Sequence, residues 1–211
     1  MDYLNGIDVS RWQGDIDFNA VRDAGMQFVF IKATEGGTFV DPRFTENWQK
    51  ANAAGLKVGV YHYFRATSST PEEQKTNIVN TLRAAGFDPA VHVLAIDIET
   101  ARNTDATSEQ MADNAFELLQ KLEQDGVLGG TLPLIYCDNN TWRNHLDAQR
   151  HDFSRYGLWI ANWNVETPTI PDTWQQAGKE WSVWQYSSKG RVAGIDGDVD
   201  LDHSRLWMLP C

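Results

Sequence analysis

Two carboxylic acids, Asp97 and Glu99, stand two positions apart in the otherwise mostly apolar stretch AIDIET. Successive side chains of a β-strand point to opposite faces, so both acids would share one face, with Cβ atoms about 6–7 Å apart. Two acids this close titrate as a pair, and the charge of one favours the protonated form of the other. A protonated carboxyl beside a second carboxylate is the arrangement that glycoside hydrolysis uses.

The segments that must position these acids alternate between strands and helices. Apolar runs predict strands at 6–10, 28–34, 58–64, 91–99, 133–137, 158–162, 182–187 and 198–203. Capping residues and glycine stops predict helices within 17–25, 41–55, 70–86 and 108–124. This order predicts an α/β fold, a single irregular (β/α)8-like barrel that is poor in helices in its last third. A hairpin through SSKGRVAGIDGD is expected to join the last two strands.

The composition limits the classes of partner. The 211 residues are expected to form a single domain, 1–211. A net charge of −11 argues against nucleic acid and anionic membranes, and no apolar stretch approaches the roughly 20 residues of a membrane span. The nine tryptophans favour a ligand groove. We expect no signal peptide at the start MDYLNGIDVS, because it lacks a basic segment followed by an apolar one.

Several polar residues are expected at the carboxyl ends of the strands, where a β/α barrel has its active site. Asp8 lies in the first strand and Asp200 in the last, and these strands are neighbours in a closed barrel. We therefore expect Asp8, Asp97, Glu99 and Asp200 to converge as a catalytic cluster. The substrate-binding candidates at the same end are Lys32, Glu35, Tyr61, Tyr63, Tyr136, Asn162, Trp163, Trp184 and Gln185.

Metal chemistry has little support in the sequence. Asp196, Asp198 and Asp200 have the spacing of the first ligands of an EF-hand loop, but Leu201 replaces the required glycine and Trp207 the final glutamate. The five histidines show no HxH or HExxH spacing. We expect no metal and no cofactor. Cys137 is expected to be a buried thiol, and a bridge to Cys211 stays open.

Seven motifs extend this reading to the whole chain: GIDVSRWQG, FVFIKATEG, GVYHYFR, the Asp-x-Glu of AIDIE, LWIANW, VWQYSS and VDLDHS. In this order and spacing they resemble the family 25 glycoside hydrolases, which are lysozymes (N-acetylmuramidases) that cleave bacterial peptidoglycan. The resemblance covers about residues 5 to 207, so we expect the single domain, 1–211, to be a catalytic glycoside hydrolase domain with no separate cell-wall-binding domain. It implies hydrolysis of the β-1,4 bond between N-acetylmuramic acid and N-acetylglucosamine with retention, and it implies a partner, the peptidoglycan glycan strand, that lies outside the cytosol.

The resemblance also implies roles for individual residues. Glu99 matches the general acid/base, and Asp97 matches a second carboxylate that acts through the 2-acetamido group of the substrate or stabilises charge directly. Asp8 and Asp200 match the acids that complete the site, and the matching cleft positions are Tyr61, Tyr136, Trp184 and Gln185. The family usually has Asp-x-Asn in the last motif, where this chain has Asp202.

Two points stay open from the sequence. The carboxyls of Asp97 and Glu99 would lie roughly 5–8 Å apart, which overlaps the distances of retaining and of inverting enzymes, so retention rests on the resemblance. We expect Glu99 to stay protonated near neutral pH because Asp97 and Asp8 are ionised beside it.

The alternative function is a non-catalytic, glycan-binding barrel. In either case we expect a monomer.

Overall fold

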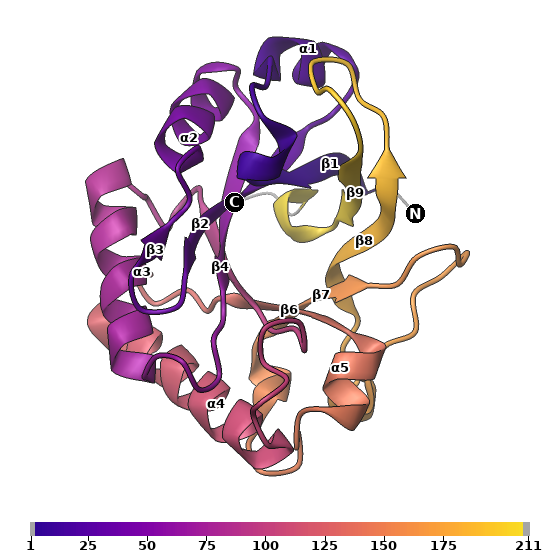
Figure 1. Ribbon diagram of the computed structural model, residues 1–211. Helices are drawn as coiled ribbons and strands as arrows, with labels where there is room; N and C mark the ends of the chain where they lie inside the picture. Colours follow the sequence, from indigo (N-terminus) through magenta and orange to yellow (C-terminus); the bar gives the residue numbers. More distant parts are fainter. Residues whose placement is uncertain (1–2, 209–211) are drawn as a thin grey trace.

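A closed barrel of eight strands forms the centre of the computed structural model, which describes residues 3–208 (Figure 1). The sheet order is β1-β9-β8-β7-β6-β5-β4-β2, and β1 pairs with β2 to close it. The two-residue strand β3 (Phe39–Val40) pairs antiparallel with the end of β2 and was not predicted. The barrel strands are β1 (Leu4–Val9), β2 (Phe28–Glu35), β4 (Lys57–Tyr63), β5 (Val93–Asp97), β6 (Leu134–Asp138), β7 (Gly157–Ala161), β8 (Trp181–Gly190) and β9 (Val199–Ser204).

The direction of the strands changes at one place in the barrel. From β1 through β2 and on to β8, neighbouring strands run parallel. Strand β9 runs antiparallel to both β8 and β1, so the predicted hairpin between the last two strands is confirmed. This pairing sets Asp200 opposite Asp8. The carboxyl end of β1 and the amino end of β9 therefore lie together.

The helices thin out along the chain, as predicted. Figure 1 shows the long helices α2, α3 and α4 outside the barrel on the side of β2 to β5. The last two helices contain six and five residues. The α-helices are α1 (Phe18–Asp23), α2 (Phe44–Ala53), α3 (Pro71–Ala85), α4 (Ser108–Asp125), α5 (Asn139–Asn144) and α6 (Asp172–Gln176), and the 3-10 helices are η1 (Arg11–Gln13), η2 (Phe153–Arg155) and η3 (Leu206–Met208).

Local sequence signals explain the two longest helices. Thr70 closes a capping box with Glu73, and Pro71 occupies the first turn of α3. Thr107 makes the equivalent box with Gln110 at the start of α4. Both helices end at a glycine in the left-handed conformation, which L-residues adopt only at a cost.

Apolar side chains fill the barrel interior at the end away from the predicted acids. Phe28, Phe30 and Trp159 are buried there, and the rings of Phe30 and Trp159 lie 4.4 Å apart between centroids. Glycine makes room for these rings: a Cβ on Gly6 would lie 2.5 Å from the ring of Phe28, and one on Gly59 would lie 2.3 Å from the ring of Phe30. Polar groups can therefore collect at only one end of the barrel.

Two further observations concern the chain outside this site. Cys137 is buried in β6, and Cys211 lies outside the described residues. Within residues 3–208, the helices are too short or too polar to cross a bilayer.

We predict that Gly59→Ala destabilises the fold by about 1–3 kcal/mol, because the added methyl group overlaps the Phe30 ring. Urea unfolding of the single and double variants measures this. In a Phe30→Leu background the same substitution should cost less, since the two residues are in contact. An equal cost in both backgrounds would contradict the proposed packing.

Candidate active site

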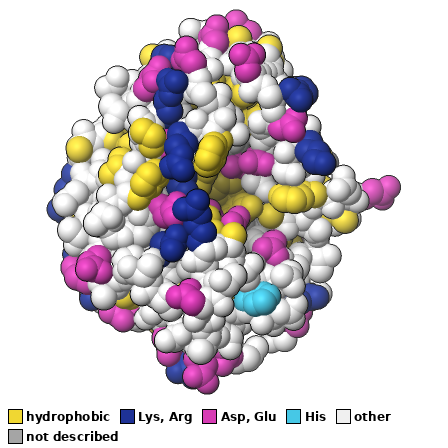
Figure 2. All heavy atoms as spheres, viewed as in Figure 1, with side chains coloured by type: hydrophobic (Ala, Val, Ile, Leu, Met, Phe, Trp, Pro, Cys, Tyr) yellow, Lys and Arg dark blue, Asp and Glu magenta, His cyan; other side chains and the backbone are white. Residues whose placement is uncertain are grey.

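A cavity of about 300 Å³ opens at the carboxyl ends of the parallel strands. Figure 2 shows it as a hollow near the centre of the face, with acidic and hydrophobic side chains around it. The lining side chains come from strands or loops that are far apart in the sequence. They are Asp8, Ser10, Trp12, Lys32, Tyr61, Tyr63, Asp97, Glu99, Tyr136, Trp159, Trp163, Gln185, Ser188 and Asp200.

The structure brings together the four predicted acids. It also places six of the substrate-binding candidates in the same cavity: Lys32, Tyr61, Tyr63, Tyr136, Trp163 and Gln185. The period-two alternation of the strands explains this agreement, because residues at every second position face the interior.

Three predicted substrate-binding residues do not line the cavity. Trp184 points to the outer side of β8, where its Nε1 donates a hydrogen bond to Asn162 O at 2.9 Å. Gln185, the next residue along, faces the interior, and two adjacent strand residues cannot share one face. Asn162 accepts a hydrogen bond from Thr169 N at 2.9 Å and so secures a loop. Glu35 lines a neighbouring pocket.

Sequence reasoning missed other lining residues. Trp12 follows β1 in the 3-10 helix η1, and 76% of its surface is exposed beside the cavity. Its position directly after the first strand end is a signal that could have identified it. Trp159 and Ser188 also line the cavity. Counting every second residue back from the end of β7 would have placed Trp159 inside the barrel.

Asp97 and Glu99 line the cavity together, at the end of β5 and just beyond it. Burial raises the pKa of Asp97, and the charge of Glu99 raises it further. Burial also raises the pKa of Glu99, against a hydrogen bond from Tyr63, and the charges of Asp138 and Asp200 add to the rise. Burial is thus the first cause, whereas the sequence reasoning gave that role to ionised Asp97 and Asp8.

Tyr63 and Asn103 hold the segment that carries Glu99. The Tyr63 hydroxyl lies 3.2 Å from Glu99 Oε2 and 2.5 Å from Ala101 O. The side-chain amide of Asn103 donates to Glu99 O at 2.9 Å and to Phe64 O at 3.0 Å. Asn103 Oδ1 accepts a hydrogen bond from Ala66 N at 2.7 Å. These contacts fix the backbone at Glu99 and just after it.

A second group of acids lies across the cavity, where β1 meets β9. Burial raises the pKa of Asp8, and the charges of Asp200 and Asp202 raise it further. Burial raises the pKa of Asp200 to about 6. Asp202 is completely buried, and burial raises its pKa as well. Its Oδ1 accepts a hydrogen bond from Trp159 Nε1 at 2.8 Å, and its carboxyl group is also hydrogen-bonded to that of Asp8.

Gln185 connects this acidic group to the aromatic wall. Its Nε2 donates to Asp8 Oδ2 at 2.7 Å. Its Oε1 accepts hydrogen bonds from the Tyr136 hydroxyl at 3.1 Å and from Trp163 Nε1 at 3.0 Å. One amide therefore fixes the orientation of one acid and two rings.

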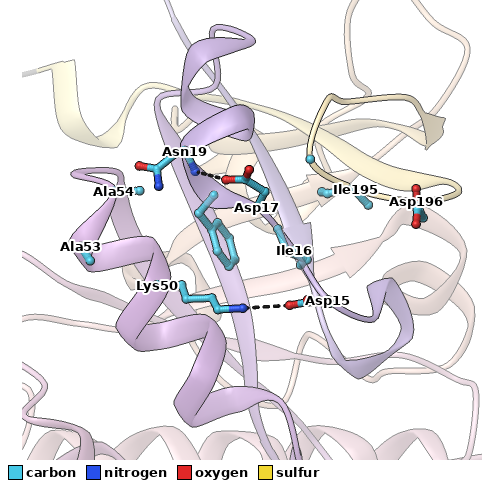
Figure 3. A pocket seen from close by; sticks show the side chains of 11 residues that line it. Asp15, Ile16, Asp17, Asn19, Lys50, Ala53, Ala54, Ile195 and Asp196 are labelled. Atoms are coloured by element: carbon cyan, nitrogen blue, oxygen red, sulfur yellow. Dashed lines mark hydrogen bonds and ion pairs between the residues drawn. The ribbon is translucent and has the colours of Figure 1, made fainter.

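A larger cavity, of about 590 Å³, lies on the outside of the barrel between α1, α2 and the β8–β9 hairpin (Figure 3). Three of its charged residues, Asp15, Asp17 and Lys50, have structural partners. Lys50 pairs with Asp15 at 2.8 Å, and Asp17 accepts hydrogen bonds from the first backbone N–H groups of α1. In the described part of the chain, no group of three His, Cys, Asp or Glu side chains is arranged to hold a metal ion. The strand-end cavity is therefore the candidate active site.

A barrel whose strand ends carry buried acids and aromatic rings is the arrangement of a barrel glycosidase. The sequence profile of glycosyl hydrolases family 25 matches residues 7–195, so the chain belongs to that family.

Known members of the family resemble this chain in sequence and in structure. Lysozyme M1 of Streptomyces globisporus is 32% identical, over 93% of this chain and 66% of that protein. The autolytic lysozyme of Clostridium acetobutylicum is 33% identical, over 94% of this chain and 55% of that protein. The chain thus spans between about half and two thirds of these relatives. The bacterial lysozyme from Streptomyces coelicolor superposes with a TM-score of 0.81 at 30% identity, over 97% of this chain and 93% of that one.

We predict that Asp202→Asn stabilises the protein at neutral pH. A buried carboxyl with a raised pKa binds its proton more tightly in the folded state, so its contribution to stability falls as the pH rises from about 4 through that raised pKa. Asparagine keeps an acceptor for Trp159 and carries no charge.

Thermal unfolding at pH 4 and at pH 7 tests this prediction. The variant should melt at least about 2–4 °C higher than the wild type at pH 7, with a smaller difference at pH 4. Asp196→Asn, at an exposed position, is the matched control. A gain that is the same at both pH values would refute the electrostatic explanation.

Proposed function

We propose that this protein is a lysozyme of the N-acetylmuramidase type. It hydrolyses the β-1,4 bond between N-acetylmuramic acid and N-acetylglucosamine in bacterial peptidoglycan. The observation that carries the proposal is the pair Asp97 and Glu99, both with raised pKa values, in an aromatic cavity at the strand ends. The lysozymes among its relatives support the same activity.

In this mechanism Glu99 is the general acid and base. Burial raises the pKa of the pair, so the pair keeps one proton to a higher pH than an isolated carboxyl does. Glu99 is the less buried of the two acids, and it delivers that proton to the glycosidic oxygen as the bond from that oxygen to the anomeric carbon breaks. It then accepts a proton from the attacking water, which restores the starting state.

Asp97 acts on the positive charge of the sugar in the transition state. A positive charge develops on the sugar ring in the transition state, and a nearby carboxylate lowers its energy. Asp97 either stabilises this charge directly or orients the 2-acetamido group of the muramic acid to do so. Asp8 and Asp200 add negative potential on the far wall, and the reaction proceeds with retention.

The aromatic side chains bind the sugars. Trp12 and Trp163 are 76% and 46% exposed, which leaves ring surface free to stack on a sugar face. Tyr61 and Tyr136 are buried deeper in the cavity and contact the ring of Trp159 edge-on. The partner is a peptidoglycan glycan strand, on which the protein acts as a monomer outside the cytosol and without a cofactor.

A non-catalytic glycan-binding barrel is the alternative. Binding alone requires hydrogen bonds and ring surfaces. It gains nothing from several buried carboxyls, whose ionised forms are costly to remove from water. The raised pKa values of Asp97, Glu99, Asp8 and Asp200 therefore favour hydrolysis.

We predict that Glu99→Gln lowers the rate of wall lysis by about 10²–10⁴-fold, because the proton donor is lost. The loss of turbidity of a wall suspension measures the rate, and co-sedimentation with walls should show that binding is kept. Mass spectrometry of the wild-type products should find new reducing ends on N-acetylmuramic acid.

Glu117→Gln, on the outer surface of α4, is the matched control and should lyse walls at the wild-type rate. If Glu99→Gln keeps most of its activity, Glu99 is not the acid. If wild-type protein binds walls and releases no fragments, the glycan-binding alternative is correct.

We also predict an alkaline limb in the pH dependence of kcat/KM. The active form carries the proton on Glu99, so activity falls as the pH rises through the raised pKa of the pair. Asp97→Asn removes the second titrating carboxyl of the pair, so the upper titration of the coupled pair should be lost and Glu99 should titrate at a lower pH. Carboxyl ¹³C NMR titration measures it even where the activity is small. An unchanged Glu99 titration would mean that the two acids are not coupled.

A further inference from the structure

A basic pocket lies beside the candidate active site, although the chain carries a net charge of −11. Arg11, Arg65 and Arg102 line this pocket, whose volume is about 300 Å³. Figure 2 shows Lys and Arg side chains gathered along one side of the central hollow. Lys32 lines the active cavity and its Nζ lies 2.8 Å from Glu35 Oε2, which lines the basic pocket. The two pockets therefore share a wall.

Positive charge is in excess in this pocket. Glu35 is in contact with three cations, because Lys32 reaches its Oε2 while Arg65 and Arg102 each lie 3.1 Å from its Oε1. Although burial acts to raise the pKa of Glu35, the hydrogen bond and charge of Lys32 and the two arginines hold it below its usual value. Glu73, the other acid of the pocket, is occupied by its capping box at Thr70.

Arg11 adds a charge that no acid neutralises among residues 3–208. Its guanidinium lies over the ring of Trp12 at 4.7 Å and over the ring of Phe39 at 5.0 Å. These ring contacts hold the planar group in place and leave its N–H edges available. A donor fixed in advance loses less entropy when a ligand binds.

Further donors in this pocket are unused. Arg65 Nε and Ser69 Oγ are buried and have no hydrogen-bond partner within the described chain. The Gly36–Gly37 turn packs against them, since a Cβ on Gly36 would lie 3.1 Å from Ser69 Oγ and 3.2 Å from Arg65 Cγ. A buried donor without a partner costs about 1–3 kcal/mol unless something satisfies it.

The donor set fits a carboxylate. Guanidinium groups present paired N–H donors that match the two oxygens of a carboxylate, and such charge-assisted bonds are among the strongest hydrogen bonds in proteins. In peptidoglycan, a short peptide with free carboxylates extends from the lactyl group of N-acetylmuramic acid. A peptide that extends from a sugar in the active cavity toward this side would pass the shared wall formed by Lys32 and Glu35.

We propose that the pocket of Arg11, Arg65 and Arg102 binds a carboxylate of the peptide attached to N-acetylmuramic acid. This inference rests on the proposed function, and it makes the protein selective for glycan strands that carry peptides. Glycan without peptides keeps the lactyl carboxylate itself, which is the other source of the same chemistry. The two sources can be separated by experiment.

The test measures the binding of glycan fragments to protein that carries Glu99→Gln. One sample of fragments keeps its peptides, and an amidase removes them from the other. The double variant Arg11→Gln/Arg102→Gln should bind the peptide-bearing fragments about tenfold or more weakly, and the peptide-free fragments within about twofold of the parent. Arg83→Gln is the matched control, because Arg83 and Arg102 are both 59% exposed and Arg83 pairs with Asp125 far from the pocket.

Each remaining outcome overturns the proposal. A loss confined to the peptide-free sample would assign the pocket to the lactyl carboxylate. An equal loss for both samples would assign it to a part of the glycan that both share, and no loss for either would show that it binds no part of the substrate. Thermal unfolding of the variants identifies any loss that comes from misfolding, and Arg102→Gln alone then serves as the milder variant. Binding needs no hydrolysis, so an inactive wild type would refute the proposed function and leave this test intact.

Discussion

The structure depends on the apolar packing that fills the barrel below its acidic cavity. Phe28 and Phe30 occupy space that Gly6 and Gly59 leave empty, and Trp159 closes the layer beneath the acids. This packing excludes water from one end of the barrel. The carboxyls at the other end lie against a medium that solvates charge poorly, which is why burial is the first cause of the raised pKa of each of them.

Hydrogen bonds then distinguish the acids from one another. Asp8 is held by Gln185 and Asp202 by Trp159, whereas Glu99 has only the hydroxyl of Tyr63. Asp8 and Asp202 are therefore fixed by donors from the neighbouring strands β8 and β7. Glu99 lies beyond the end of its strand, and its side chain is only partly buried. The same cavity thus contains both rigid and accessible carboxyls.

The apolar periodicity and the turn and capping residues of the sequence predicted the barrel and the final hairpin, because these are local signals. They also predicted that the four acids converge. The prediction placed both Trp184 and Gln185 in the cavity. Adjacent strand residues face opposite sides, and Gln185 takes the inward position. The irregular pairing of β8 and β9 beyond Gln185 follows from contacts between strands and has no local signal. The causes of the pKa of Glu99 could not be read from spacing, since burial depends on the whole barrel. Arg11, Arg65 and Arg102 come from three separate segments, and only the fold shows that they meet.

The reversed direction of β9 determines where the chain leaves the barrel. Leu4 pairs with Ser204, at the end opposite to the cavity, and the ring of Trp207 then packs against Phe28 with 5.3 Å between centroids. A parallel final strand would have delivered the chain to the substrate side. A module joined after the barrel would therefore begin on the side opposite to the acidic cavity.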